Sequence, residues 1–157
     1  TIHWRFLQGP LTWGQGYQWF DSKEVRRGGG PPLQALELVG KHLESMPEET
    51  VLLGFSQGCM TILHGVAFGL RKAKAAACYG GWVVGKPTFN PDARTPLLFV
   101  GGTADKLATP EKVREAVQLF DNRGVPTEHI EHGGGHSVPN ELAEKVAAWL
   151  IKKTRGG

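Results

Sequence analysis

A serine between two glycines is the residue of this chain best suited to do chemistry. Gly54-Phe55-Ser56-Gln57-Gly58 fits the pattern G-x-S-x-G, in which the serine lies on a sharp turn between a strand and a helix. A short apolar run over residues 51–53 precedes it, and a mostly apolar stretch over residues 59–70 follows. We therefore expect Ser56 to end a buried strand, to begin a helix, and to present its hydroxyl as a nucleophile.

A serine nucleophile needs a base to take its proton and a third group to orient that base. Asp105 follows a strand-like run at 96–100, and His136 lies in a glycine-rich loop after a second run at 127–131. Each residue alone has an ordinary interpretation, as a turn residue, a helix cap or a solvated side chain. Three such residues in the order serine, acid, histidine, each on a loop after a predicted strand, predict a catalytic triad.

The chain resembles the phospholipase/carboxylesterase branch of the α/β-hydrolases, which includes the acyl-protein thioesterases. The resemblance covers nearly the whole chain and implies that Ser56 is the nucleophile, Asp105 the orienting acid and His136 the general base. It also implies hydrolysis of carboxylic esters or thioesters without a cofactor. The matching stretches are residues 54–60, 101–105 and 133–139, together with Gln8-Gly9-Pro10 and Trp19-Phe20-Asp21.

The N-terminal part departs from that family. The family usually has further strands before this point, including one that ends in His-Gly, and no His-Gly occurs in the first forty residues. The chain is either a fragment or a minimal form in which a first strand, over residues 2–7, replaces the missing one. The Gln57 backbone N–H is the expected first donor of the oxyanion hole. Leu11 is the candidate second donor, because Pro10 has no N–H.

Four apolar residues are candidates for the substrate pocket. Trp13 and Trp82 either line an acyl or alcohol pocket or cover the core, as large aromatic side chains often do. Leu107 and Val138 come shortly after the predicted acid and base, so we expect them in the wall of the site. No long insertion resembles a lid, which favours an open, shallow pocket for small or short-chain esters.

Alternating strands and helices must position these residues. Helices are expected after Pro31-Pro32 up to Pro47, over 59–70, from Pro110 to Phe120 and after Pro139, and strands near 2–7, 50–55, 75–79, 96–101 and 126–131. Strands separated by helices form a parallel sheet. We therefore predict one α/β domain over residues 1–157, with a mostly parallel sheet of about five strands flanked by helices. This is a minimal α/β-hydrolase fold without the usual early strands. The loop over 9–32 is long, and such loops are usually functional.

Composition limits the possible partners. The chain is 40% apolar and 21% charged, with a formal net charge of +3, as expected of a globular protein. Its basic residues are not interleaved with aromatic ones, so no nucleic-acid partner is predicted. No membrane span or signal peptide is visible, and a cytoplasmic location is the default inference. Missing early strands would leave a sheet edge exposed, so we expect a homo-oligomer.

The cysteines and histidines indicate neither a disulfide framework nor a metal site. Cys59 and Cys78 both lie in apolar stretches and are expected to be buried free thiols. His129 and His132 flank the last predicted strand near His136, but a metal site would require convergent ligands that a glycine loop does not hold. No metal or cofactor is therefore predicted.

These observations together predict a serine carboxylesterase that acts on small-molecule esters through an acyl-enzyme. A thioesterase acting on acyl-proteins or acyl-CoA could use the same residues. A hydrolase-like binding module, with a failed oxyanion hole and little or no activity, is the alternative from another class.

Overall fold

A four-stranded parallel sheet forms the centre of the computed structural model, which describes residues 2–28, 32–70 and 73–156. The strands are β3 (Leu52–Phe55), β4 (Ala76–Tyr79), β5 (Leu97–Gly102) and β6 (Thr127–His132), and they lie side by side in that order. The predicted α/β class with a parallel sheet is confirmed, and β4 forms at the alanine-rich segment where strand propensity is weak. Every residue of β4 and of β5 is buried, as expected for strands covered on both faces.

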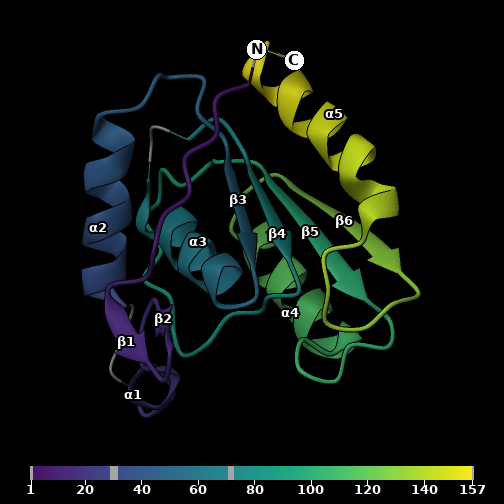
Figure 1. Cartoon of the computed structure of the whole chain (residues 1–157). Coiled ribbons are helices and arrows are strands. Elements are labelled where there is room, and N and C mark those ends of the chain that lie inside the picture. Colours follow the sequence, from purple (N-terminus) through teal and green to yellow (C-terminus); the bar gives the residue numbers. More distant parts are fainter. Residues whose placement is uncertain (1, 29–31, 71–72, 157) are drawn as a thin grey trace.

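Helices cover both faces of this sheet (Figure 1). Helices α3 (Gln57–Phe68) and α4 (Pro110–Asp121) pack on one face, and α2 (Leu33–Glu44) packs against α3. Helix α5 (Ala143–Thr154) follows a 3₁₀ turn at Asn140–Leu142 and packs on the opposite face through Val146 and Leu150. All four helices lie where the sequence predicts them. Pro32 caps α2, and Pro31, at which that helix was expected to open, lies outside the described residues.

Local residues explain where α4 begins and where α3 ends. Thr109 caps α4 by accepting the Lys112 N–H, and Pro110 occupies the first turn, where its missing N–H costs nothing. Helix α3 ends at Gly69, which adopts a left-handed conformation with φ 97°, as is usual after a helix C-terminus. None of the helices within the described ranges is both long enough and apolar enough to cross a bilayer.

The strand predicted over residues 2–7 is wrong. Ile2, Trp4 and Phe6 alternate as in a strand, but their side chains are exposed, and Phe6 is 88% exposed. No strand among the described residues pairs with this segment, which contacts the end of α2 through a hydrogen bond from Arg5 Nη1 to Ser45 Oγ of 3.1 Å. A strand needs a paired neighbour to be stable. The main sheet therefore has four strands instead of about five, and β3 is an edge strand.

The long loop predicted over residues 9–32 contains regular structure. An antiparallel hairpin joins β1 (Leu11–Trp13) to β2 (Gly16–Gln18), and the short helix α1 (Ser22–Arg26) follows with Asp21 as its cap. We call residues 11–18 the N-terminal hairpin. Figure 1 shows it beside α1, at the end of the sheet where the β3 arrow points.

The Gln57 side chain holds the segment after this hairpin to the start of α3. Its Oε1 accepts the Trp19 N–H at 2.6 Å, and its Nε2 donates to the Phe20 carbonyl at 2.9 Å. Both bonds are part-buried, and they satisfy two backbone groups that lie between β2 and α1. One side chain thus connects the N-terminal segment to the nucleophile turn predicted from the sequence.

Replacing Gln57 by leucine is expected to lower the free energy of unfolding by about 1–3 kcal/mol, because two part-buried backbone groups lose their partners. Urea unfolding measures this change, and limited proteolysis is expected to cut the N-terminal hairpin faster in the variant. Gln118→Leu, on the exposed surface of α4, is the matched control and should change the unfolding free energy by less than about 0.5 kcal/mol. Equal effects of the two substitutions would contradict the role given to Gln57.

Candidate active site

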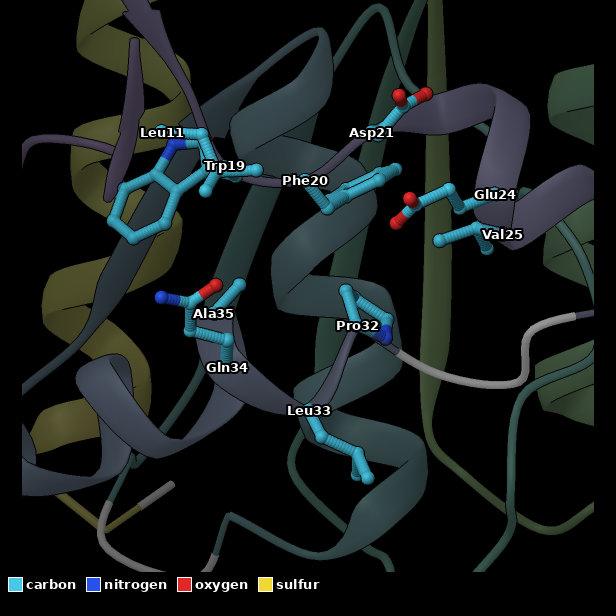
Figure 2. Close-up of a pocket in the computed structure, with 10 residues that line it drawn as sticks. All are labelled: Leu11, Trp19, Phe20, Asp21, Glu24, Val25, Pro32, Leu33, Gln34 and Ala35. Atoms are coloured by element: carbon cyan, nitrogen blue, oxygen red, sulfur yellow. The ribbon is translucent and has the colours of Figure 1, made fainter.

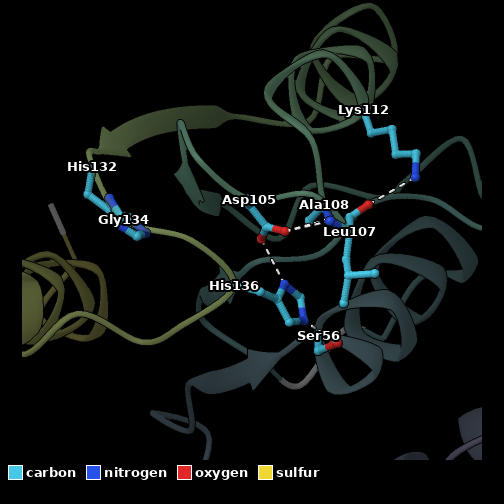
Figure 3. A network of polar contacts seen from close by, with 8 residues as sticks. All are labelled: Ser56, Asp105, Leu107, Ala108, Lys112, His132, Gly134 and His136. Atoms are coloured by element: carbon cyan, nitrogen blue, oxygen red, sulfur yellow. Dashed lines mark hydrogen bonds and ion pairs between the residues drawn. The ribbon is translucent and has the colours of Figure 1, made fainter.

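Three loops at one edge of the sheet bring together the serine, histidine and aspartate singled out in the sequence. Ser56 follows β3, Asp105 follows β5 and His136 follows β6, and the carboxyl ends of parallel strands meet at the same edge. His136 Nε2 lies 2.9 Å from Ser56 Oγ, and His136 Nδ1 lies 2.7 Å from Asp105 Oδ2 (Figure 3). The three side chains form one continuous hydrogen-bonded series at the carboxyl ends of β3, β5 and β6.

Ser56 lies on a strained turn. Its φ of 53° and ψ of −117° are unusual for a residue with a side chain, and it is the only non-glycine with positive φ among the residues that the structure describes. Such conformations persist only where the surrounding structure holds them, and they occur often in active sites. Gly54 permits the turn, because a Cβ there would lie 2.7 Å from the Cys59 nitrogen and from the Ile62 side chain.

Hydrogen bonds to both carboxylate oxygens hold Asp105 in place. Oδ1 accepts the N–H groups of Leu107 at 2.8 Å and Ala108 at 2.9 Å, which leaves Oδ2 for His136. The side chain is buried, with the residue only 4% exposed. Burial opposes ionisation, but the hydrogen bonds from His136 and from the two amides outweigh it, so the pKa of Asp105 lies below its ordinary value. Asp105 does not cap α4, since Thr109 occupies that position.

His136 packs between an aromatic ring and a glycine. The centroids of the Phe55 and His136 rings lie 4.8 Å apart. A Cβ on Gly80, which follows β4 with φ 54°, would lie 3.2 Å from His136 Nδ1. These contacts limit the positions open to the imidazole. Sequence reasoning missed the role of Phe55, because the G-x-S-x-G pattern leaves its second position open.

The two predicted oxyanion donors occupy different surroundings. Gln57 is the first residue of α3, and the N–H groups of a first helical turn have no acceptor within the helix. Leu11 begins β1, and it lines a pocket of about 440 Å³ between the N-terminal segment and α2, which neither Ser56 nor His136 lines (Figure 2). The predicted strand that would have led into Leu11 does not form. Both donor roles stay predictions.

The four predicted pocket residues also differ in their surroundings. Leu107 and Val138 are exposed on the loops that carry the acid and the histidine, and Figure 3 shows the Leu107 side chain extending toward Ser56. Trp82 is half-buried against the core, and Lys112 Nζ lies 4.5 Å from its ring centroid. Trp13 is 71% exposed on the N-terminal hairpin. Their roles in substrate binding stay predictions.

Of the two remaining candidate histidines, His132 has a hydrogen-bond partner, whereas His129 Nε2 is buried and has none among the residues that the structure describes. His132 Nδ1 accepts the Gly134 N–H at 3.1 Å. No cluster of three or more histidine, cysteine, aspartate or glutamate side chains that could hold a metal occurs within the described ranges. Cys59 and Cys78 are buried free thiols, as predicted. Burial and the neighbouring Cys78 thiol raise the pKa of Cys59.

Comparisons with known proteins find serine hydrolases and carboxylesterases similar to this chain. The family model described as "Serine hydrolase (FSH1)" matches residues 10–148. The probable carboxylesterase SOBER1-like of Arabidopsis thaliana is 29% identical over 153 residues, which cover 86% of this chain and 58% of that protein. Carboxylesterase SOBER1 of the same plant is 27% identical, over 94% of this chain and 74% of its own length.

One solved structure has the same fold as this chain although the two sequences are only distantly similar. The Bacillus cereus carboxylesterase superposes with a TM-score of 0.77 at 14% identity, over 93% of this chain and 73% of that one. The chain spans little more than half the length of the SOBER1-like relative. The resemblance to carboxylesterases found in the sequence is confirmed, and because the family model matches most of its length, the chain belongs to the FSH1 serine hydrolase family.

Proposed function

We propose that this protein hydrolyses small or short-chain carboxylic esters through an acyl-enzyme on Ser56. The observation that carries the proposal is the hydrogen-bonded series from Ser56 through His136 to Asp105. Membership of a serine hydrolase family and relatives named as carboxylesterases support the reaction class. The exposed Leu107 and Val138 side chains, on open loops beside the series, favour small substrates over long acyl chains.

In this proposal, each of the three side chains has its own role. With its Nδ1–H donated to Asp105 Oδ2, His136 has Nε2 free to accept the Ser56 proton as Oγ attacks the ester carbonyl carbon. His136 then gives that proton to the departing alcohol, which leaves the acyl group on Ser56. A water molecule, deprotonated by the same imidazole, releases the acid and restores the serine. Ionised Asp105 holds the imidazole in this tautomer and stabilises the imidazolium that forms twice in each cycle.

Ser56→Ala is expected to reduce hydrolysis of p-nitrophenyl acetate and butyrate by at least about 10³-fold, because the acyl acceptor is lost. Labelling by a fluorophosphonate probe should disappear in the same variant. Ser22→Ala, in α1, is the matched control and should keep both the ester hydrolysis and the labelling by the probe. An acyl-CoA substrate assayed in parallel tests the thioesterase alternative. A wild-type protein with neither turnover nor labelling would instead favour a non-catalytic binding module.

Asp105→Asn is expected to lower kcat by about 10³–10⁴-fold with little change of fold, because a neutral amide neither fixes the imidazole tautomer nor stabilises its cation. Steady-state kinetics measure the loss, and circular dichroism checks the fold. Asp121→Asn removes a carboxylate at the end of α4 that accepts a hydrogen bond from Thr127, at the start of β6 and so at the opposite end of that strand from His136, and it should leave kcat unchanged. A loss of less than tenfold at Asp105 would contradict its assigned role.

We also propose that the protein self-associates along the free edge of β3. The N–H groups of Leu52 and Ser56 donate inward to the Ala75 and Tyr79 carbonyls. Backbone groups alternate in direction along a strand, so the N–H groups of Leu53 and Phe55, which lie between them, face away from the sheet. The side chains of Leu53 and Phe55 are partly exposed on the same strand. An apolar edge of this kind is a ready template for a second chain.

Light scattering is expected to give a dimer or larger species at micromolar concentration, and Leu53→Lys is expected to shift it to the monomer, because a buried lysine at the edge opposes pairing. Ile151→Lys, on the partly exposed side of α5, should leave the mass unchanged. A monomeric wild-type protein would contradict the proposal.

A further inference from the structure

We infer that Lys112 is a positioning residue for the Asp105 carboxylate and acts through one peptide group. Lys112 Nζ donates to the Leu107 carbonyl at 2.9 Å (Figure 3). That carbonyl belongs to the peptide bond whose N–H, on Ala108, donates to Asp105 Oδ1 at 2.9 Å. The ammonium and the carboxylate therefore bind the two ends of a single peptide group. The inference rests on the proposed function, since it deepens the account of the same site.

A peptide group between a cation and an anion is held more firmly than one with neutral partners. The group is planar, so fixing its carbonyl also fixes the direction of its N–H. Hydrogen bonds in series polarise one another, and bonds to charged groups are stronger than neutral ones. The ammonium on the Leu107 oxygen therefore strengthens the bond from Ala108 to Asp105 Oδ1. With Oδ1 engaged in this way, Oδ2 faces His136.

The surroundings of Lys112 hold its ammonium in place. Lys112 lies in the first turn of α4, with its own N–H bound to the Thr109 cap, and Nζ lies 4.5 Å from the centroid of the Trp82 ring. A cation over an indole face is attracted by the ring. Trp82 thus contacts the residue that supports the acid loop, a role different from the pocket role predicted from the sequence.

The position of this lysine is not explained by helix stability. The N-terminus of a helix carries partial positive charge, so a cation in its first turn is unfavourable there. Lys112 is also exposed, and replacing an exposed side chain usually changes stability little. The favourable interactions of the Lys112 ammonium at this position are its contacts with the Leu107 carbonyl and the Trp82 ring.

The decisive experiment removes the ammonium and keeps most of the apolar stem. In Lys112→Met, kcat for p-nitrophenyl butyrate is expected to fall about three- to tenfold, the size of one net hydrogen bond, while KM changes by less than about twofold. Lys112→Arg should restore kcat to near the wild-type value, because a guanidinium can donate to the same carbonyl and stack on Trp82. Lys145→Met removes one positive charge from an exposed position of α5 and is the control. Its kcat and KM should match those of the wild type.

A second measurement does not depend on turnover. Amide hydrogen exchange followed by NMR in the resting protein should show the Ala108 N–H exchanging several-fold faster in Lys112→Met and at the wild-type rate in Lys112→Arg and Lys145→Met. Faster exchange at Ala108 supports the inference even if the wild-type protein proves inactive, in which case only the proposed function fails. Unchanged exchange in Lys112→Met, or an arginine variant as impaired as the methionine variant, would overturn it.

Discussion

The hydrogen bond between His136 Nδ1 and Asp105 Oδ2 is the contact on which the rest of the site depends. It joins loops from β5 and β6, which are neighbours paired in register from Leu97 with Thr127 to Gly102 with His132. That register brings the two loops to the same height at the sheet edge. Gly102 allows them to approach, since a Cβ there would collide with the Gly134 and Gly135 carbonyls. The acid and the imidazole meet because two adjacent strands end together.

The nucleophile side of the site depends on packing. A residue with positive φ costs on the order of 1–3 kcal/mol, and surrounding contacts must offset that cost. Helix α3 supplies them, because nine consecutive residues after the turn, from Cys59 to Ala67, are buried. A helix buried on all sides cannot rotate to relieve the strain at Ser56, the residue just before it. The packing that makes the core rigid thus also holds Ser56 in its strained conformation.

The sequence predicts best where a feature depends on neighbouring residues. The glycines around Ser56, Pro110 at the start of α4 and the apolar run of β5 are local signals. The order of strands and loops brings Ser56 and His136 together although 80 residues separate them. The strand predicted from the alternation of Ile2, Trp4 and Phe6 does not form. A strand also needs a neighbouring strand to pair with, and a local pattern says nothing about that neighbour. The hairpin was missed although Gly14 is the first residue of its two-residue turn, with φ 58°, and a glycine at that position is a recognisable hairpin signal.

The sequence did not predict hydrogen bonds between polar side chains and individual backbone groups, because no sequence pattern marks them. The amide of Gln57 and the ammonium of Lys112 find their carbonyls only after the chain has folded. The Gln57 amide has a practical consequence, because it joins the residue beside the nucleophile to a surface segment nearly forty positions earlier. An epitope, a fluorophore or a protease nick introduced at the hairpin tip would lie a few residues from the two backbone groups that the Gln57 side chain binds. This surface loop therefore offers an engineer a place to install external control over the hydrolase without altering any of its reacting groups.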